Sequence, residues 1–501
     1  MTHFSVCSSS QARKCDQLAI HSHHIPALLL MEQAAFQSCL LIEEQIKADQ
    51  NIVILCGPGN NGADGMAIAR LLYQKDYAVK VIHPLYDLMS EDEKIQYNII
   101  DALHITKTKD EQQAIEWISS CDCLIDCLFG NGLNRNIEEP YLSMIQTIHE
   151  SKPYTISIDM PSGIHATTGQ IMKNYIPCDL LISLDCFKEG QWIHPGNQAY
   201  QEITCVPIGI DPSFHQKDTI YLDSSYIQKI LPSRLIHAHK GTYHKACMIG
   251  GSQNMHGAIK MATEACYRSG IGTLTLMIPD CIQTTIQNTC PFAMMLSYPS
   301  QNGFFHPQAI DLANTTLNNF DIISIGNGMG LNPVTEQFVS CVLHTEKIVV
   351  IDADGLNALQ GQMDLLHRKA PTILTPHIKE MSVLMNCSIQ DILKDPFGIT
   401  RQFCLTYPNC ILILKSSHTW IGQNDQLYLY SHPHSALAKG GSGDILCGII
   451  TGLLGQTSPL EASLCAVAIH NQCAWQIKKD PASLLPADLI HAISSSFEYF
   501  R

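Results

Sequence analysis

The chain has 501 residues, more than a single hydrophobic core usually holds, so two or three domains are expected. Its formal net charge of −15 argues against nucleic acid and anionic membranes as partners, because both need clustered Lys and Arg. The 21 cysteines are scattered through apolar runs without paired zinc spacing, and no run approaches the roughly 20 apolar residues of a membrane helix, so we expect reduced thiols and a cytoplasmic protein.

The first half of the chain alternates predicted helices with apolar strands. A segment rich in Leu, Met and Ala predicts a helix over 25–47, and a second helix is expected over 66–75. Apolar strands are expected over 51–56, 78–83, 123–128, 154–159 and 179–184, with a last edge strand over 203–212. Strands that are apolar throughout suit a parallel sheet covered on both faces, so we predict a Rossmann-like, doubly wound α/β domain.

A polar, weakly patterned segment over 213–230 marks the expected domain boundary. We therefore predict a first domain over 1–215, a linker over 216–229 and a second domain over 230–501. In the second domain, strands are expected over 245–250, 272–278, 321–326, 347–352, 372–375 and 410–415, with a helix over 258–268 between the first two. The alternation again predicts an α/β domain.

A glycine-rich turn follows the first predicted strand, with the sequence Cys-Gly-Pro-Gly-Asn-Asn-Gly-Ala-Asp-Gly over 56–65. Its glycines permit unusual backbone conformations and close approach of a ligand, and Asn60 and Asn61 offer side-chain amides. Asp64 stands at the expected start of a helix, where it would cap the first turn. Bare N–H groups and the helix dipole at this point suit an anion such as phosphate. The simpler alternative is a tight strand-to-helix turn with a capping Asp.

Two further strands of the first half end in polar residues. Asp126 stands at the end of one strand ahead of a glycine loop, and Asp159 and Ser162 follow the next strand. Because the carboxyl ends of parallel strands line one edge of a sheet, we expect these residues to converge with Asn61. Hard oxygen ligands suit a cation such as potassium or a sugar hydroxyl, and an Asp at a strand end can act as a general base. Singly, each Asp is better explained as a structural cap; as a set they indicate a site.

These motifs together resemble the NAD(P)H-hydrate epimerases, the YjeF N-terminal domain. The resemblance is carried by Gly-Pro-Gly-Asn-Asn-Gly-Ala-Asp-Gly, Ile-Asp-Cys-Leu-Phe-Gly-Asn-Gly and Ile-Asp-Met-Pro-Ser-Gly-Ile-His, in order across about residues 10–215. It implies that Asp159 is catalytic and contacts the reacting part of hydrated NAD(P)H, and that Asn61, Asp126 and Ser162 hold potassium. The remaining implied substrate-binding residues are Asn60, Asn61, Gly62, Ala63, Asp64, Gly130, Asn131, Gly132, Leu133, Asn134, Arg135 and Asn136. Ala63 replaces the family's usual glycine, which strains the turn only if φ there is positive.

A second glycine-rich turn, Lys-Gly-Gly-Ser-Gly-Asp over 439–444, precedes a helix of small and apolar residues. Its backbone amides can neutralise a developing negative charge, and Asp444 can remove a proton from a substrate hydroxyl. Transfer of a phosphoryl group to an alcohol needs this pairing. The structural alternative is a helix N-cap within a glycine-rich turn.

Other turns of the second half also place polar residues after strands. Lys415 and the hydroxyls that follow it over 416–419 suit nucleotide phosphates. Asp352 ends a strand, where it could belong to the site or only brace loops. His377 precedes a helix, where it could belong to the site or only cap that helix. A further glycine-rich turn, Ile-Gly-Asn-Gly-Met-Gly, spans 325–330.

These features resemble the ribokinase-like fold and, within it, the ADP- or ATP-dependent NAD(P)H-hydrate dehydratases. His-Lys-Gly-Thr-Tyr, Ile-Gly-Gly-Ser, Asp-Ala-Asp-Gly-Leu-Asn, Leu-Thr-Pro-His and Gly-Gly-Ser-Gly-Asp-Ile-Leu carry the resemblance across roughly 230–501. It implies that Asp444 is the catalytic base and that hydrated NAD(P)H is bound by Ala258, Gly328, His377 and Asp444. It also implies a site for the AMP part of ADP or ATP, used with Mg²⁺, made by Lys415, Ser416, Ser417, His418, Thr419 and Gly443. The chain departs from the usual pattern at Asn327 in the glycine loop, at Ser416 after the Lys, and at Phe292, where an acidic residue is common.

The two resemblances together predict a bifunctional repair enzyme. The first domain would epimerise the R and S forms of hydrated NADH or NADPH, and the second would dehydrate the S form with ADP or ATP as phosphate donor. One alternative is a ribokinase-like kinase of a small molecule, such as a vitamin precursor, fused to a nucleotide-binding domain; another is a non-catalytic nucleotide sensor. A homo-oligomer is expected, because ligand sites in such folds often lie near subunit contacts.

Overall fold

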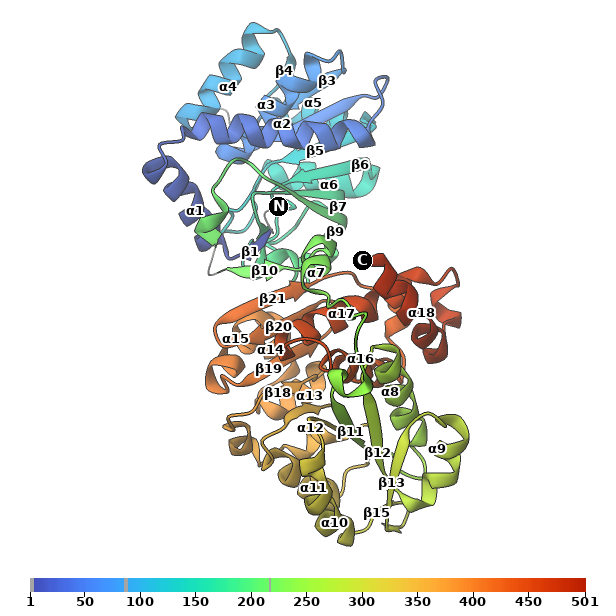
Figure 1. Cartoon of the computed structure of the whole chain (residues 1–501). Helices are drawn as coiled ribbons and strands as arrows, with labels where there is room; N and C mark the ends of the chain where they lie inside the picture. The colour runs from blue at the N-terminus through green and yellow to red at the C-terminus, as the bar shows by residue number, and fades with distance from the viewer. Residues whose placement is uncertain (1–3, 85–88, 216–217) are drawn as a thin grey trace. The chain divides into compact units, whose positions relative to one another are not determined.

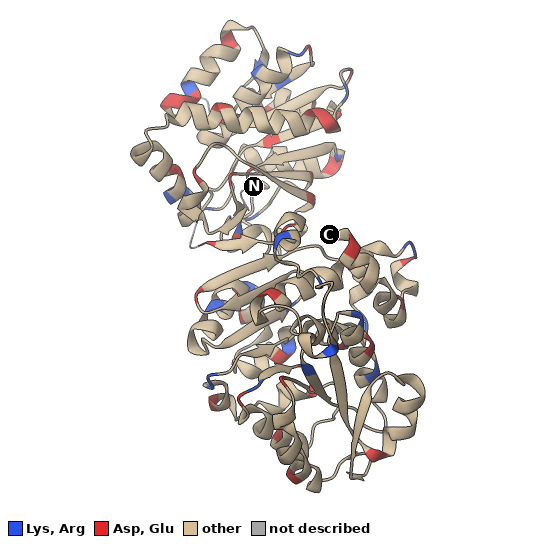
Figure 2. Cartoon of the chain, viewed as in Figure 1, with Lys and Arg blue, Asp and Glu red and all other residues tan. Residues whose placement is uncertain are grey.

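The computed structural model describes residues 4–84, 89–215 and 218–501. The chain divides into two compact units, Met1–Ile220 and Tyr221–Arg501 (Figure 1). The division falls inside the segment predicted as a linker, which contains strand β10 (Thr219–Tyr221) and all but the last residue of helix α7 (Ser224–Ile230). Lys and Arg positions are scattered among Asp and Glu along the ribbons of both units (Figure 2). Among the described residues, no helix combines the length and apolar character needed to cross a bilayer.

The N-terminal unit contains a seven-stranded parallel sheet in the order β4-β3-β2-β5-β6-β7-β9. Its strands are β2 (Ile52–Cys56), β3 (Val79–Ile82), β4 (Thr106–Thr108), β5 (Cys123–Cys127), β6 (Tyr154–Ile158), β7 (Cys178–Leu184) and β9 (Tyr200–Val206). The doubly wound prediction is confirmed, and the predicted edge strand does lie at the edge, although it ends at Val206 because Pro207 follows. The strand order reverses between β2 and β5, which opens a crevice at their carboxyl ends.

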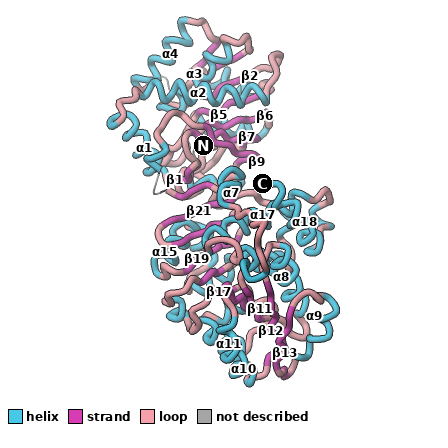
Figure 3. Tube along the Cα trace, in the orientation of Figure 1, coloured by secondary structure: helices cyan, strands magenta, loops and turns pink. Residues whose placement is uncertain are grey.

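Helices cover both faces of this sheet (Figure 3). They are α1 (Ser9–Ser22), α2 (Ala27–Gln45), α3 (Asn60–Tyr73), α4 (Glu91–Ala102), α5 (Glu111–Ser120) and α6 (Tyr141–Ser151). Alternate residues of β2 face opposite sides: Ile54 packs into a core with α2 and α3, and Val53 packs into a second core with α5 and α6. Both side chains are fully buried, which explains why the strand is apolar throughout.

Helix α3 begins at Asn60, six residues before the predicted start at 66, so this boundary prediction was wrong. Asp64 therefore lies inside the helix instead of capping it, and the N-cap is Gly59, whose φ of 112° is accessible to glycine. The glycines in the first turns serve packing. A Cβ on Gly62 would lie 1.8 Å from the Gly57 carbonyl oxygen, and one on Gly65 would lie 2.7 Å from the Cys127 Cβ. Tertiary packing thus outweighs the low helix propensity of these residues.

Three short strands lie outside the main sheet. β1 (Ser5–Cys7) pairs in parallel with β8 (Phe187–Lys188), which places Cys7 opposite Lys188. β1 also pairs antiparallel with β10, with Val6 opposite Thr219. The N-terminal segment is therefore joined to the chain immediately after β7 and to the end of the unit.

The C-terminal unit is built on strands in the order β13-β12-β11-β16-β17-β18-β19-β20-β21. They are β11 (Lys245–Ile249), β12 (Thr273–Pro279), β13 (Met294–Tyr298), β16 (Ile322–Ile325), β17 (Ile348–Ile351), β18 (Thr372–Leu374), β19 (Cys410–Lys415), β20 (Thr419–Gln423) and β21 (Gln426–Tyr430). The predicted α/β architecture is confirmed, with parallel pairing from β13 to β19 and antiparallel pairing from β19 through β21. A two-stranded sheet of β14 (Ser300–Gln301) and β15 (Phe304–Phe305) is separate.

The helices of this unit include a closely packed pair, α8 (His256–Arg268) and α16 (Ser442–Leu453). A Cβ on Gly448 would lie 2.3 Å from the Ala262 carbonyl oxygen, so glycine is required for this approach. Besides α7, the other helices are α9 (Gln283–Thr289), α10 (Gln308–Thr316), α11 (Pro333–Leu343), α12 (Asp354–Ala358), α13 (Ile378–Leu384), α14 (Ile389–Lys394), α15 (Pro396–Thr406), α17 (Pro459–Gln476) and α18 (Pro486–Tyr499). The packing of α16 on α8 fixes the glycine-rich turn at the start of α16.

Two candidate active sites

The N-terminal unit has a cavity of about 620 Å³ at the carboxyl ends of β2, β5, β6 and β7. Residues of α1 and α2 form its other walls. The predicted residues that line it are Asn60, Asn61, Asp64, Gly130, Asn131, Gly132, Leu133, Asn134, Arg135 and Asp159. Sequence reasoning therefore placed most of the expected substrate-binding residues around a single cavity.

Five predicted residues lie outside the lining of this cavity. Gly62 and Ala63 are buried within α3, Asn136 follows Arg135 in the loop, and Asp126 and Ser162 are fully buried. Ala63 has no positive φ, and its amide donates to the Gly59 carbonyl at 3.1 Å in the helical pattern. The methyl group of Ala63 is therefore accommodated without backbone strain.

Asp159 follows β6 with a φ of 69°, a left-handed conformation that an Asp adopts only at a cost. Its Oδ2 accepts the Asn131 backbone N–H at 2.8 Å, and its Oδ1 pairs with the Lys188 ammonium. Lys188 is buried and also donates to the carbonyl oxygens of Leu184 at 2.8 Å and Cys186 at 3.0 Å. Burial lowers the pKa of Lys188, but the charge and hydrogen bond of Asp159, together with the neighbouring Cys186 and Cys205, outweigh it, and the net shift is upward. The pair therefore fixes the Asp159 carboxylate at the cavity wall.

Asp64 presents a different kind of carboxyl group to the same cavity. Burial, followed by the charges of Asp159 and Asp16, raises the pKa of Asp64 well above its usual range, which favours the protonated form of this side chain. Burial likewise raises the pKa of Asp16 on α1 to about 6. The cavity thus combines a carboxyl group whose surroundings favour the protonated form with a carboxyl group paired to an ammonium group, an arrangement that suits separate acid and base roles.

The predicted cation ligands form a buried oxygen-rich group. Asp126 is fully buried and accepts hydrogen bonds from the Ser157 hydroxyl at 2.8 Å, the Ser162 hydroxyl at 2.6 Å and the backbone N–H groups of Ser162 and Leu128. Burial raises the pKa of Asp126, and these hydrogen bonds oppose the rise. Both polar atoms of the Asn61 amide are buried without a hydrogen-bond partner among the described residues. An orphaned amide oxygen beside the cavity fits a hard cation.

Sequence reasoning missed Lys188, the only cation paired with Asp159 among the ion pairs of the described residues. Its position could have indicated a role in the site, because it comes shortly after the predicted strand over 179–184, at the same sheet edge as the predicted aspartates. It also missed Glu93 of α4, whose Oε2 accepts the Gly59 N–H at 2.8 Å and whose Oε1 bonds the buried His83 at 2.7 Å. Glu93 therefore braces the glycine-rich turn from behind.

The C-terminal unit has a cavity of about 880 Å³ at the glycine-rich turn before α16. The predicted residues that line it are His377, Lys415, Ser416, Ser417, Thr419, Gly443 and Asp444. The His418 ring is buried and its Nδ1 is 2.8 Å from the Ser431 hydroxyl, away from the lining. Ala258 and Gly328 also lie outside the lining but adjoin one another, because a Cβ on Gly328 would lie 3.0 Å from that of Ala258.

Asp444 occupies the first turn of α16, behind an N-cap glycine, Gly441, with a φ of 95°. Its Oδ1 accepts a hydrogen bond of 2.8 Å from the Asn327 side-chain amide, which also donates to the Asp352 Oδ2 at 3.2 Å. Burial and the neighbouring Asp352 charge raise the pKa of Asp444 to about 6, while Asn327 and Lys415 restrain the rise. At neutral pH most of Asp444 is therefore ionised and able to accept a proton.

Lys415 and Asp352 form a charge pair beside Asp444. The Lys415 Nζ is 3.1 Å from the Asp352 Oδ1, which also accepts the Thr375 hydroxyl at 2.6 Å. Burial lowers the pKa of Lys415, and the charges of Asp352 and Glu380 outweigh it, so the net shift is upward. A Cβ on Gly443 would lie 3.3 Å from this ammonium group, which places the cation against the glycine-rich turn. Glycine amides and a cation together suit a phosphate group.

His377 caps α13 and also lines the cavity. Its Nδ1 accepts the Glu380 N–H at 3.1 Å, and the Glu380 Oε2 accepts the His377 N–H at 2.9 Å, which completes a capping box. The side chain of His377 is 52% exposed, so its ring remains open to a ligand. The capping alternative is therefore observed, and it does not exclude the binding role.

Comparisons with known proteins agree with the two-unit organisation. The family described as "YjeF-related protein N-terminus" matches residues 27–190, and the family described as "NAD(P)H-hydrate dehydratase" matches residues 246–495. Each match lies within one of the two compact units. Together the matched segments account for most of the chain.

Curated relatives extend over nearly the whole chain. A bifunctional NAD(P)H-hydrate repair enzyme of Moorella thermoacetica is 29% identical over 470 residues, covering 90% of this chain and 88% of that protein. The enzymes of the same description from Dictyoglomus turgidum and Coxiella burnetii are 28% and 29% identical, and each alignment covers 96% of both chains. A solved ribokinase-like superfamily protein from Enterococcus faecalis has a TM-score of 0.50 and 24% identity, covering 56% of this chain and 95% of that one, and it shares the fold.

Proposed function

The chain belongs to the family of bifunctional NAD(P)H-hydrate repair enzymes, and on that premise we propose that it restores hydrated NADH and NADPH. The N-terminal domain, residues 1–215, interconverts the R and S hydrates. The C-terminal domain, residues 230–501, dehydrates the S form with ADP or ATP as phosphate donor. The observation that carries the proposal is the ionisable Asp444 at a glycine-rich helix start, with Lys415 in the same cavity.

In the N-terminal site, we assign the two carboxyl groups to opposite roles. Protonated Asp64 can give a proton to the hydroxyl of the hydrated ring as that group departs. The Asp159 carboxylate, held by Lys188 and the Asn131 N–H, can stabilise the positive ring that this departure leaves and guide water back to either face. Asn61, Asp126 and Ser162 would hold K⁺, which supplies a fixed positive charge to the phosphates of the substrate when bound.

In the C-terminal site, Asp444 accepts the proton of the ring hydroxyl while the hydroxyl oxygen attacks the terminal phosphorus of the nucleotide. The nucleotide leaves with one phosphate fewer. The phosphate on the ring carbon then departs with the bonding electrons, and loss of the neighbouring C–H proton restores the double bond. Phosphate is a better leaving group than hydroxide, which explains the need for a phosphate donor.

Two groups of the C-terminal site position the nucleotide. The N–H groups of the turn at 440–443 and the Lys415 ammonium bind its phosphates. Mg²⁺ would supply additional positive charge there, and the carboxylates of Asp352 and Glu380 in the lining are suitable oxygen ligands. Ser416, Ser417 and Thr419 line the part of the cavity assigned to the AMP portion.

Recovery of NADH from an R/S hydrate mixture tests the proposal. Purified protein is incubated with the mixture, K⁺, Mg²⁺ and either ADP or ATP, and absorbance of the NADH band and released phosphate are followed. We expect complete recovery with equimolar phosphate release, and the faster nucleotide identifies the donor. A stable phosphorylated product without NADH would indicate the small-molecule kinase instead, and binding without turnover would indicate a sensor.

Two further predictions concern the state of the protein in the cell and in solution. Self-association is tested by light scattering coupled to size-exclusion chromatography, and the cytoplasmic location by cell fractionation. Both stay predictions.

A further inference from the structure

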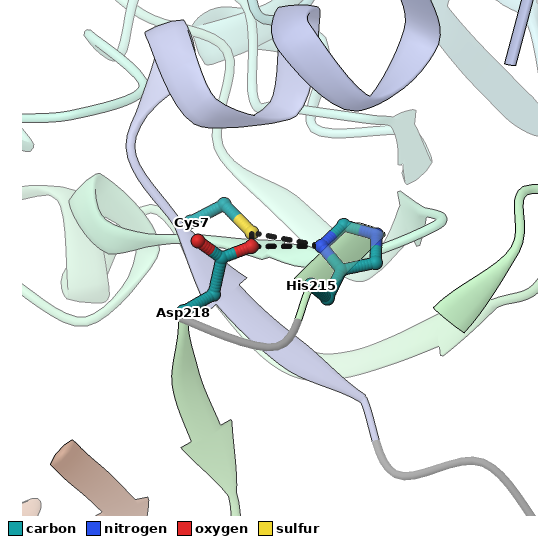
Figure 4. A group of neighbouring side chains, drawn as sticks. All are labelled: Cys7, His215 and Asp218. Carbon is teal, nitrogen blue, oxygen red and sulfur yellow. Dashed lines mark hydrogen bonds and ion pairs between the residues drawn. The ribbon is translucent and has the colours of Figure 1, made fainter. Parts of the chain in front are cut away.

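A buried group of metal-binding side chains lies beside the N-terminal cavity. Cys7 of β1, His215 and Asp218 each offer one ligand atom, and these three atoms all lie within 4.8 Å of one another. Figure 4 shows the three side chains pointing toward a common centre. Cys7 and Asp218 are buried, and the His215 side chain is only 9% exposed. We propose that this group binds a divalent transition-metal ion, with Zn²⁺ as the best match.

The distances within the group are close to those of a metal coordination shell. The Cys7 Sγ is 3.5 Å from the His215 Nδ1 and 3.1 Å from the Asp218 Oδ2, and the Nδ1 is 2.9 Å from that same Oδ2. In a tetrahedral zinc site with Zn–S of about 2.3 Å and Zn–N and Zn–O of about 2.0–2.1 Å, ligand atoms lie about 3.3–3.6 Å apart. Movements of a few tenths of an ångström would therefore complete the site.

The second nitrogen of His215 is already held as it is in many metal sites. The Asp185 Oδ2 is 2.9 Å from the His215 Nε2. A carboxylate at this position fixes the proton on Nε2 and directs the lone pair of Nδ1 toward a metal. The combination of a thiolate, an imidazole and a carboxylate favours a borderline ion such as Zn²⁺ over K⁺ or Mg²⁺, which prefer oxygen ligands alone.

Two more thiols flank the group and can supply a fourth ligand. The Cys15 Sγ is 3.6 Å from the His215 Nδ1, and Cys186 packs against Cys7 in the same buried cluster. On binding, the metal replaces the protons now shared among these groups, so the Cys7 thiol and the His215 Nδ1 release their protons to solvent.

The location gives the site a consequence for the neighbouring cavity. β1, which carries Cys7, leads directly into α1, and residues of α1 line the cavity. Asp185 and Cys186 also line it, and Lys188 lies opposite Cys7 in the pairing of β1 with β8. A bound metal would therefore hold the N-terminal segment against the strand that carries the partner of Asp159.

Titration with Co²⁺, a spectroscopic substitute for Zn²⁺, tests the site in the full-length chain. Protein stripped with a chelator and kept reduced is titrated with CoCl₂. We expect visible d–d bands and a thiolate-to-cobalt charge-transfer band that saturate at a single Co²⁺ per chain and disappear when Zn²⁺ is added. Zn²⁺ should also raise the Tm of the stripped protein, because a ligand that binds only the folded state stabilises it.

Three variants separate this site from adventitious binding. Cys7→Ser should remove the Cys7 contribution to the charge-transfer band, leaving at most a weaker band from a flanking thiol, and Asp218→Asn should weaken Co²⁺ binding at least tenfold. Cys281→Ser, which removes an exposed thiol, serves as the matched control and should leave the titration unchanged. Circular dichroism and dehydration activity report whether each variant is folded. A wild-type titration without the charge-transfer band, or an equal band in folded Cys7→Ser, would overturn the assignment.

Discussion

The two units place an aspartate on a helix that follows a glycine-rich turn, yet the groups around that aspartate shift its pKa to different extents. In the N-terminal unit, burial and the neighbouring Asp159 and Asp16 raise the pKa of Asp64 well above its usual range, and the nearby cation, Lys188, is paired with Asp159. In the C-terminal unit, the Asn327 amide and the Lys415 charge hold the pKa of Asp444 to about 6. The same local motif therefore suits the acid role that we propose for Asp64 or the base role that we propose for Asp444, according to the groups around it.

Asp444→Asn tests the basic half of this comparison most strongly. The amide cannot accept the proton of the ring hydroxyl, so dehydration should fall by about 10²–10⁴-fold, the usual contribution of a general base. Epimerisation should be unchanged, because Asp444 lines only the C-terminal cavity. NADH recovery and chromatographic separation of the R and S hydrates measure the two activities. Dehydration at the wild-type rate in this variant would remove Asp444 from the mechanism.

Lys188→Met tests the pairing that distinguishes the N-terminal site. Removing one partner of a buried ion pair costs about 3–5 kcal/mol in unfolding free energy, because the Asp159 charge is left without compensation. We expect a lower Tm and a large loss of epimerisation, with dehydration retained where the protein is folded. Lys47→Met, at an exposed position, is the matched control. Epimerisation at the wild-type rate in folded Lys188→Met would contradict the role of the pair.

Asn327→Ala sharpens the comparison by removing the donor that restrains the pKa of Asp444. A hydrogen bond to a charged group contributes about 1.5–3 kcal/mol, and this one favours the ionised form of Asp444. Loss of this hydrogen bond therefore raises the pKa of Asp444. Because Asp444 must be ionised to act as a base, the rising limb of the pH–rate profile moves from about 6 to higher pH. Dehydration should fall most at low pH and little at pH 8. An unshifted limb would show that Asn327 only packs the loop.

Ala63→Gly should have the smallest effect. Since Ala63 is in a helical conformation, replacing it with glycine relieves no backbone strain. The replacement lowers the unfolding free energy by about 0.5–1 kcal/mol, because glycine has a lower helix propensity than alanine. Epimerisation should be unchanged, and thermal unfolding measures the difference. A more stable glycine variant would show that the methyl group is strained in this turn.

Much of the fold and most of both sites could be predicted because strand ends in parallel sheets carry function. Asp159 and Asp444 were found from the residues that follow an apolar strand or open a helix. Helix α1 was missed although Ser8 and Gln11 form a capping box that the sequence contains. β20 and β21 were also missed, although Asn424, with a φ of 54°, marks the turn between them.

The contacts that could not be predicted join residues far apart in the sequence. The role of Lys188 could not be predicted from the sequence, because its contact with Asp159 depends on the pairing of β6 with β7. Cys7 and His215 are separated by 208 positions, so no spacing rule for metal ligands applies to them. Likewise, Asn327 was visible only as a departure from a family pattern, and its contact with Asp444 required the structure.

Mixing two single-site variants tests most directly whether one chain carries two independent active sites. Asp159→Ala alone should recover only the S hydrate as NADH, and Asp444→Asn alone should recover none. An equimolar mixture of the two, given the R/S hydrates with the preferred nucleotide, should recover both epimers completely, because each variant supplies the activity that the other lacks. Recovery by the mixture that stops at the level of Asp159→Ala alone would contradict the account.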